Sequence, residues 1–345
     1  MNQKITLKHL GPVEAFDMEI KNFNILIGEQ AAGKSTIAKG IYFFRLIKAA
    51  LVEYLCQVYD RSAYKGEDIS QGFEEALKNE LKSVFAALFG YSWDLDTRLY
   101  LRYEYSQEIW IDIQLTQDQK KYIDIQYSPK LKNSVLPLEQ EAKQLASEKP
   151  VQGVSLSFAS KERLRYYEYF KNSINEIFED DRETYYIPAG RSMITLLSGN
   201  RSMIENENLD LITRRFLQII DSIHMFFADG IRGVPQRYSD ESHSFDPGET
   251  AQMLIRYLKG DYRYTPGVEY FIVEQGEHKG ETIPINFTSS GQQEVLWLLN
   301  QLYILMLKKE RAFVIIEEPE AHLYPSLQKE IVDFISFFVN INHSA

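Results

Sequence analysis

The first sixty residues pass from an alternating to a helical pattern of apolar and polar side chains. Short strands are predicted over Lys4–Lys8, Glu14–Ile20 and Phe23–Ile27. The third is almost wholly apolar, which is typical of a strand buried on both faces of a sheet. Helical patterns follow over about Ser35–Val58 and Ile69–Leu88. The chain therefore opens with strands that lead into long helices.

The middle of the chain has less regular patterning. Strong alternation over 97–127 predicts antiparallel strands or hairpins. Residues 128–160 are polar and weakly patterned, so we expect a surface loop with one short helix. A helix is predicted over Lys161–Phe178 and a strand over Thr184–Ile187, followed by a mostly helical region over 191–260.

The last part of the chain again mixes strands and helices. Tyr270–Val273 and Thr282–Asn286 predict a hairpin, and a helix is expected over about Gly291–Leu307. Ala312–Ile316 is a second apolar strand, and Ser326–Phe338 a final helix. The alternation of strands and helices along the whole chain predicts an α/β fold.

Composition narrows the classes of protein that fit. The 345 residues include one cysteine, Cys56, which excludes an internal disulfide and a cysteine metal cluster and fits a reducing cytoplasm. Cys56 lies in an apolar helical run and is expected to be buried. No apolar run approaches the ~20 residues of a membrane helix. The net charge of −11 disfavours nonspecific binding to a polyanion, although a local basic patch stays possible.

A phosphate-binding motif lies between the apolar strand and the first long helix. It matches G-x-x-x-x-G-K-S and consists of Gly28, Glu29, Gln30, Ala31, Ala32, Gly33, Lys34 and Ser35. Backbone N–H groups and the helix N-terminus are expected to point at phosphate oxygens. Lys34 should reach the β- and γ-phosphates and Ser35 a Mg²⁺ ion, with Thr36 in the same site. The alternative is a glycine-containing helix cap with an exposed lysine.

Two carboxylates follow the second apolar strand. Glu317 and Glu318 come directly after Ala312–Ile316, and ligands of such folds bind at the carboxyl ends of parallel strands. Glu317 is predicted to hold the Mg²⁺ shell, and Glu318 to orient or deprotonate the attacking water. The alternative is a solvated turn, because Glu-Glu-Pro also favours turns.

A third motif opens a helix just before this strand. Ser290 is the predicted N-cap, and Gly291 would let the backbone approach a ligand beside Gln292. Taken alone, this motif is an ordinary helix cap.

The order GEQAAGKS, SSGQQE and FVIIEEPEAHLYP resembles the ABC ATPase superfamily, above all its soluble branch of SMC, RecF and OLD-type proteins and anti-phage ATPases. The opening ITLKHLGPVEAFDMEIKNFNILIGEQAAGKST is similar to the same branch. The resemblance implies an α/β P-loop NTPase fold of ABC ATPase type, with a mixed central sheet, an antiparallel subdomain and a helical lobe. It divides the chain into an N-terminal ATPase part (1–130), a mainly helical lobe (131–260) and a C-terminal ATPase part (261–345).

The resemblance also implies roles. ATP and Mg²⁺ would be the cofactors, and two copies would pair head to tail around two nucleotides. Ser290 and Gly291 would clamp the γ-phosphate held by the other copy, Glu318 would be the catalytic base, and the segment 321–325 would be the D-loop. Arg191 would either sense phosphate or bind a partner, or form a surface salt bridge.

The sequence departs from the family pattern at several positions. Glu317 replaces the usual Asp, SSGQQE lacks the leading Leu and second Gly of transporter versions, and no Gln marks a Q-loop at the strand end. The switch histidine is expected beyond Ala345, so hydrolysis by these 345 residues alone is left open.

Three functions fit these motifs. The favoured one is a cytoplasmic ATPase that dimerises on ATP and drives or gates a DNA-acting or nuclease-like partner, in phage defence or DNA repair. The others are an ATP-dependent sensor that holds a toxic partner with little turnover, and the nucleotide-binding half of a transporter. For DNA, Lys161, Arg163 and Arg165 share a helix with Tyr166, Tyr167 and Tyr169, which is either a nucleic-acid stripe or an ordinary amphipathic helix.

Overall fold

The chain folds into two compact units, Met1–Asp181 and Arg182–Ala345, which are described one at a time. The computed structural model describes residues 3–62, 72–90, 98–115, 123–148, 156–198, 209–238 and 242–344. The predicted start of the second helix at Ile69 lies outside these residues. The division into three parts at residues 130 and 260 stays a prediction.

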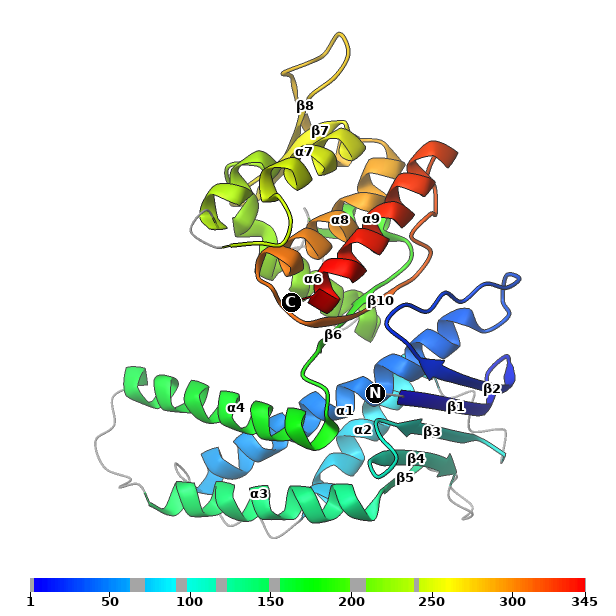
Figure 1. Ribbon diagram of the computed structural model, residues 1–345, viewed down its shortest axis with the longest axis vertical. Coiled ribbons are helices and arrows are strands. Elements are labelled where there is room, and N and C mark those ends of the chain that lie inside the picture. Colours follow the sequence, from blue (N-terminus) through cyan, green and yellow to red (C-terminus); the bar gives the residue numbers. More distant parts are fainter. Residues whose placement is uncertain are drawn as a thin grey trace. The chain divides into compact units, whose positions relative to one another are not determined.

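The first unit contains a five-stranded antiparallel sheet in the order β2-β1-β3-β4-β5 (Figure 1). Its strands are β1 (Gln3–Leu10), β2 (Val13–Ile20), β3 (Tyr100–Glu104), β4 (Trp110–Leu115) and β5 (Ile123–Tyr127). Along β1, Ile5 and Leu7 are buried and alternate with more exposed residues, so one face of the sheet supplies core. The antiparallel strands predicted from alternation over 97–127 are confirmed among the described residues.

The described residues of this unit also form four helices. They are α1 (Lys34–Asp60), α2 (Phe73–Phe89), α3 (Pro129–Ser147) and α4 (Leu156–Phe178). Helix α1 lies against the other three and is buried along most of its length (Figure 1). It approaches β1 closely at Gly40, where a Cβ atom would lie 3.3 Å from the Leu7 side chain. Cys56 is buried in α1 as expected, and burial raises the pKa of its thiol to about 12.

Two predictions for this unit are wrong. Phe23–Ile27 is not a strand: Ile25 is 65% exposed and Ile27 is 91% exposed. The Asn24 side chain bonds the backbone of Lys21 and Glu19, which ends the hairpin, and no described strand pairs with the segment that follows. An apolar run becomes a buried strand only where neighbouring strands accept its backbone groups.

The segment over 128–160 contains a nineteen-residue helix rather than a loop with one short helix. Ser128 caps α3 by accepting from the Leu131 N–H, and Pro129 occupies the first helical turn. The buried positions of α3, such as Leu131 and Val135, are spaced four apart among polar residues. This spacing is that of a helix, but the many polar residues between the buried positions make the pattern hard to recognise in the sequence.

The second unit holds the remaining strands in two sheets. Strand β6 (Glu183–Ile187) pairs in parallel with β10 (Ala312–Ile316). Strands β7 (Gly260–Thr265), β8 (Val268–Val273) and β9 (Thr282–Pro284) form an antiparallel sheet. Within the described ranges, the parallel pair and the antiparallel strands never join, so the predicted mixed central sheet is not observed as one sheet.

Helix α8 is the centre of the second unit. The helices here are α5 (Arg191–Ser198), α6 (Leu211–Ile223), α7 (Pro247–Leu258), α8 (Ser290–Leu307) and α9 (Pro325–Ser344), with short 3-10 helices η5 (His224–Phe227), η6 (Ile231–Tyr238) and η7 (Ile285–Phe287). Every α8 residue from Gln293 to Leu307 is buried, and α9 lies alongside (Figure 1). In the part of the chain described, no helix is long and apolar enough to cross a membrane.

Candidate functional site

The segment Gly28–Gly33 is a loop that is exposed except at Gly33 and leads into α1 at Lys34. Ala31 (φ 61°) and Gly33 (φ 90°) adopt left-handed backbone conformations. The Lys34 Nζ atom donates to the carbonyl oxygens of Gly28 and Glu29, at 2.8 and 2.7 Å. Two carbonyls of its own loop therefore hold the ammonium in place. An anion bound there would meet this charge directly.

Gly33 has two reasons to be glycine. Its φ of 90° is costly for any residue with a side chain. A Cβ atom at this position would also lie 2.6 Å from Val13 Cγ2 and 3.3 Å from Pro12 Cγ. The turn between β1 and β2 therefore supports the loop from behind, which explains why the opening strands precede the motif.

The start of α1 has the features of an anion site. Its N-cap is Gly33, which has no side chain to satisfy the first N–H groups, and the first turn contains no acidic residue. The long helix adds a favourable dipole at this end. The Ser35 side chain is exposed and Thr36 is half-buried. Both hydroxyls therefore lie beside the N-terminus of α1, where an anion would bind.

The two carboxylates follow β10 as predicted, in the second unit. The Glu317 N–H donates to the Ile187 carbonyl at 3.0 Å, which extends the parallel pairing by one residue. Glu317 Oε2 is 3.5 Å from the Ala189 N–H. Oε1 of Glu317 is buried, and none of the described residues donates to it. Glu318 is exposed, with a φ of 42°.

The buried Glu317 oxygen tests the predicted Mg²⁺ role. A carboxylate oxygen without a donor is a ligand of the kind that Mg²⁺ prefers. Among the described residues, no three His, Cys, Asp or Glu side chains are close enough together to hold a metal by themselves. This fits Mg²⁺, which is usually held by one or two protein oxygens together with phosphates and water.

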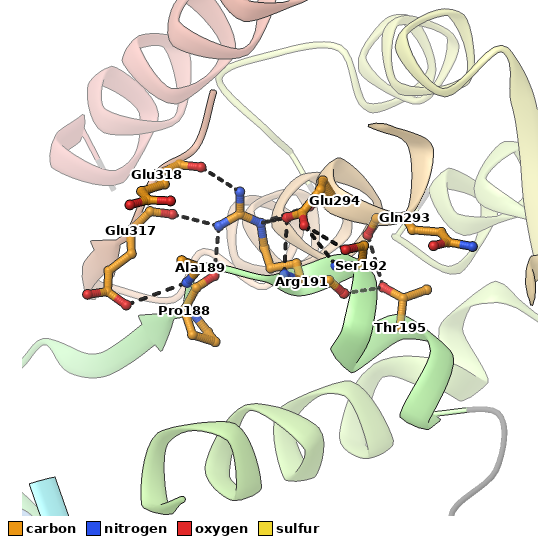
Figure 2. Close-up of polar contacts among 9 residues, drawn as sticks. All are labelled: Pro188, Ala189, Arg191, Ser192, Thr195, Gln293, Glu294, Glu317 and Glu318. Atoms are coloured by element: carbon orange, nitrogen blue, oxygen red, sulfur yellow. Dashed lines mark hydrogen bonds and ion pairs between the residues drawn. The ribbon is translucent and has the colours of Figure 1, made fainter. Parts of the chain in front are cut away.

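Arg191 lies at the centre of this part of the unit (Figure 2). Its side chain is fully buried, so the expected surface salt bridge is wrong, and so is a role in direct contact with phosphate or a partner. The guanidinium donates to four backbone carbonyls, those of Pro188, Glu294, Glu317 and Glu318. Burial lowers the pKa of Arg191, and the carboxylate of Glu294 opposes this shift.

Sequence reasoning missed both Arg191 and its partner Glu294 as structural centres. One sequence signal could have pointed to Arg191. The predicted strand is followed by Pro188, Gly190 and Arg191, which places a charged residue at the end of a parallel strand. Glu294 is the last residue of SSGQQE and is fully buried. A buried charge is almost always paired, so burial explains both residue types. Burial itself could not be read from the pattern.

The third motif begins α8, but the residue that caps the helix differs from the predicted one. Ser289, and not Ser290, is the N-cap: its Oγ accepts from the Gln292 N–H, while the Gln292 side chain accepts from the Ser289 N–H. Ser290 is the first helical residue and is exposed. The Gln292 Nε2 also donates to the Leu258 carbonyl at 2.7 Å. The Ser290 hydroxyl is thus left accessible at the helix start.

Gly291 is in contact with the segment that follows the carboxylates. A Cβ atom at Gly291 would lie 3.4 Å from the His322 carbonyl oxygen and 3.6 Å from Leu323 Cδ2. His322 has a left-handed φ of 58°. The residues over 321–325, predicted as the D-loop, therefore pack on the first turn of α8.

The structure thus brings together the second and third motifs, both in the second unit, whereas the phosphate loop belongs to the first. The joint action of the three motifs on one nucleotide stays a prediction.

Part of the basic, aromatic stripe on α4 serves packing within the first unit. Arg163 forms an ion pair with Asp60 at 3.1 Å, and the Tyr166 ring lies 4.3 Å from that of Tyr59. The Tyr169 hydroxyl donates to Glu141. Half of the residues in the stripe therefore make the packing contacts expected of an ordinary amphipathic helix. Contact between this helix and DNA stays a prediction.

Comparison with known families agrees with the loop geometry. The family model of the AAA ATPase domain matches residues 1–344. The chain therefore belongs to this family of P-loop ATPases, which confirms the predicted class at that level. AAA ATPases bind ATP and typically use Mg²⁺. No curated protein matches the chain.

Proposed function

We propose that the chain is an ABC-type ATPase of the soluble SMC, RecF and OLD-like branch. It binds ATP and Mg²⁺, pairs with a second copy while ATP is bound, and separates on hydrolysis. This cycle drives or gates a DNA-acting or nuclease-like partner in phage defence or DNA repair. The geometry of the phosphate loop carries the proposal, because Lys34 begins a long helix and two carbonyls of its own loop hold its ammonium.

Each residue has a role in the proposed reaction. The loop N–H groups and Lys34 hold the phosphates, and Ser35 with Glu317 holds the Mg²⁺ shell. When bound, Mg²⁺ neutralises the charge that develops on the phosphoryl oxygens. Glu318, which is exposed, orients the attacking water and accepts its proton. Ser290 and Gly291 receive the γ-phosphate held by the second copy. These assignments are supported by the family match, by the exposed loop and by the Glu317 oxygen to which none of the described residues donates.

A phosphate-release assay combined with an ATP-binding titration tests the proposal. Lys34→Ala should abolish ATP binding, because it removes the charge inside the loop. Glu318→Gln should keep ATP affinity and lose turnover by about a hundredfold, because the amide cannot accept the proton. The same variant should accumulate as an ATP-bound dimer, seen by light scattering as a doubled mass.

Glu320→Gln is the matched control, since Glu320 is an exposed carboxylate of the same segment. Unchanged ATP affinity in Lys34→Ala would contradict the proposed site. ATP binding without measurable turnover in the unaltered chain would instead favour the sensor.

A further inference from the structure

We propose that Arg191 is a positioning residue: it fixes the backbone of Glu318 and links Glu318 to the first turn of α8. The proposal deepens the proposed function, on which it rests, because it assumes that Glu318 activates water. Arg191 touches neither nucleotide nor water in this scheme, since its side chain is fully buried.

The guanidinium holds both peptide groups beside the Glu318 Cα atom. One terminal nitrogen donates to the Glu317 carbonyl at 2.6 Å and the other to the Glu318 carbonyl at 2.8 Å (Figure 2). These two carbonyls belong to the peptide planes on either side of Glu318 Cα. Holding both in one rigid fork therefore fixes φ and ψ of Glu318. The planar fork of arginine can do this, whereas the single ammonium of lysine cannot.

The conformation that Arg191 holds is one that Glu318 would avoid on its own. Its φ of 42° is left-handed, although it has a side chain and precedes Pro319. Both features disfavour this conformation, so it persists only where the surroundings enforce it. Among the described residues, Arg191 is the side chain that bonds both neighbouring carbonyls. Without it, the direction of the Glu318 carboxylate would no longer be set.

The same arginine is tied to α8 through Glu294. The Glu294 carboxylate accepts from the N–H groups of Arg191 and Ser192, both at 3.1 Å, and from the Ser192 hydroxyl at 2.8 Å. It therefore caps α5, whose first residue is Arg191. The Thr195 hydroxyl donates to the Gln293 carbonyl, which adds a second tie between the two helices. A shift of the first turn of α8 must therefore move the Arg191 backbone.

This chain of contacts gives ATP binding a route to the catalytic base. Ser290 and Gly291 begin α8, and Glu294 follows Ser290 by one helical turn. A γ-phosphate that binds at the start of α8 would shift Glu294 and Arg191, and through them the backbone of Glu318. Turnover would thus depend on occupation of the α8 N-terminus even though ATP is bound by Lys34.

Steady-state kinetics of Arg191→Lys and Arg191→Met test the proposal. Both variants should lose kcat by at least about tenfold, with KM and ATP affinity within about twofold of the unaltered chain. Lysine should not rescue the activity, because it cannot bridge the two carbonyls. Glu294→Gln should show the same split between kcat and KM, and it serves as the second probe if Arg191→Met does not fold.

A double variant separates positioning of Glu318 from general damage. If Arg191 acts through Glu318, adding Arg191→Lys to Glu318→Gln should leave the residual turnover unchanged. A further loss of the size seen in the single variant would overturn the proposal. Arg232→Met is the matched control, since Arg232 forms an exposed ion pair with Glu274 in the same unit, and its kcat should be unchanged.

The outcomes also separate this inference from the proposed function. If Glu318→Gln turns over ATP as fast as the unaltered chain, the proposed function fails and the inference fails with it. If Glu318→Gln is inactive while Arg191→Lys keeps full kcat, the proposed function stands and only the positioning role is wrong.

Discussion

Several residues of this chain hold a left-handed backbone conformation, which any residue with a side chain disfavours. Ala31, Gly33, Glu318 and His322 all have a left-handed φ. Three of them lie in the motifs that were predicted to bind nucleotide, and His322 packs on the third motif. Conformations of this kind persist where packing or hydrogen bonds enforce them. Gly33 adopts the conformation because it has no Cβ atom, for which Pro12 and Val13 leave no room, and the Arg191 fork holds Glu318 in it.

The phosphate loop offers a test at the residue scale. Gly33→Ala places a methyl group 2.6 Å from Val13 Cγ2 at a φ of 90°. The variant should lose about 2–3 kcal/mol of unfolding free energy. ATP affinity should fall by about tenfold or more, because the loop N–H groups lose their common direction. Denaturant unfolding and an ATP titration measure the two effects.

Gly72→Ala is the control, because Gly72 has a φ of −67° and nothing within 4 Å of an added Cβ. It should cost less than about 1 kcal/mol and leave ATP binding unchanged. ATP affinity of Gly33→Ala equal to that of the unaltered chain would show that the loop does not need this conformation.

At the scale of elements, the sequence predicted the pieces with their own periodicity or local chemistry. Helices α1 and α8 and strand β10 lie where expected, because each is a long periodic or apolar run. Predictions failed where tertiary context decides. Phe23–Ile27 reads as a buried strand and is exposed coil, and α3 is a helix whose polar residues obscure its spacing.

The residues of the candidate site also fall into those that the sequence predicted and those that it did not. Motif spacing identified the loop from Gly28 to Ser35 and the two carboxylates, because those residue types at that spacing carry the chemistry. The Arg191–Glu294 pair could not be found, because its role arises from contacts between residues 103 positions apart. Whether Ser289 or Ser290 caps α8 was also beyond the pattern, since neighbouring serines have the same preference.

The capping box of α8 provides a test at this scale. Ser289→Ala removes the hydroxyl that accepts from the Gln292 N–H, so unfolding free energy should fall by about 1 kcal/mol. Ser336→Ala is the matched control: that serine lies within α9, is half-buried and bonds only the Val332 carbonyl among the described residues. It should change stability by less than about 0.5 kcal/mol. Equal losses in the two variants, measured by denaturant unfolding, would contradict the capping role.

For the whole molecule, the main question is whether motifs that belong to two different units act on one nucleotide. The phosphate loop lies in the first unit, and the carboxylates, the Arg191 contacts and the start of α8 lie in the second. The family match covers both units, which supports their working as one ATPase. If both act on one nucleotide, a change in the second unit must alter ATP binding by the first, and Mg²⁺ is the proposed connection.

The most direct measurement is the Mg²⁺ dependence of ATP affinity in Glu317→Gln. Titration calorimetry with and without Mg²⁺ should show an increase of about tenfold on adding Mg²⁺ to the unaltered chain. In Glu317→Gln the increase should shrink to about twofold, while Mg²⁺-free affinity stays unchanged. Glu320→Gln should behave like the unaltered chain. A full Mg²⁺ response in Glu317→Gln would contradict the claim that the two units serve the same nucleotide.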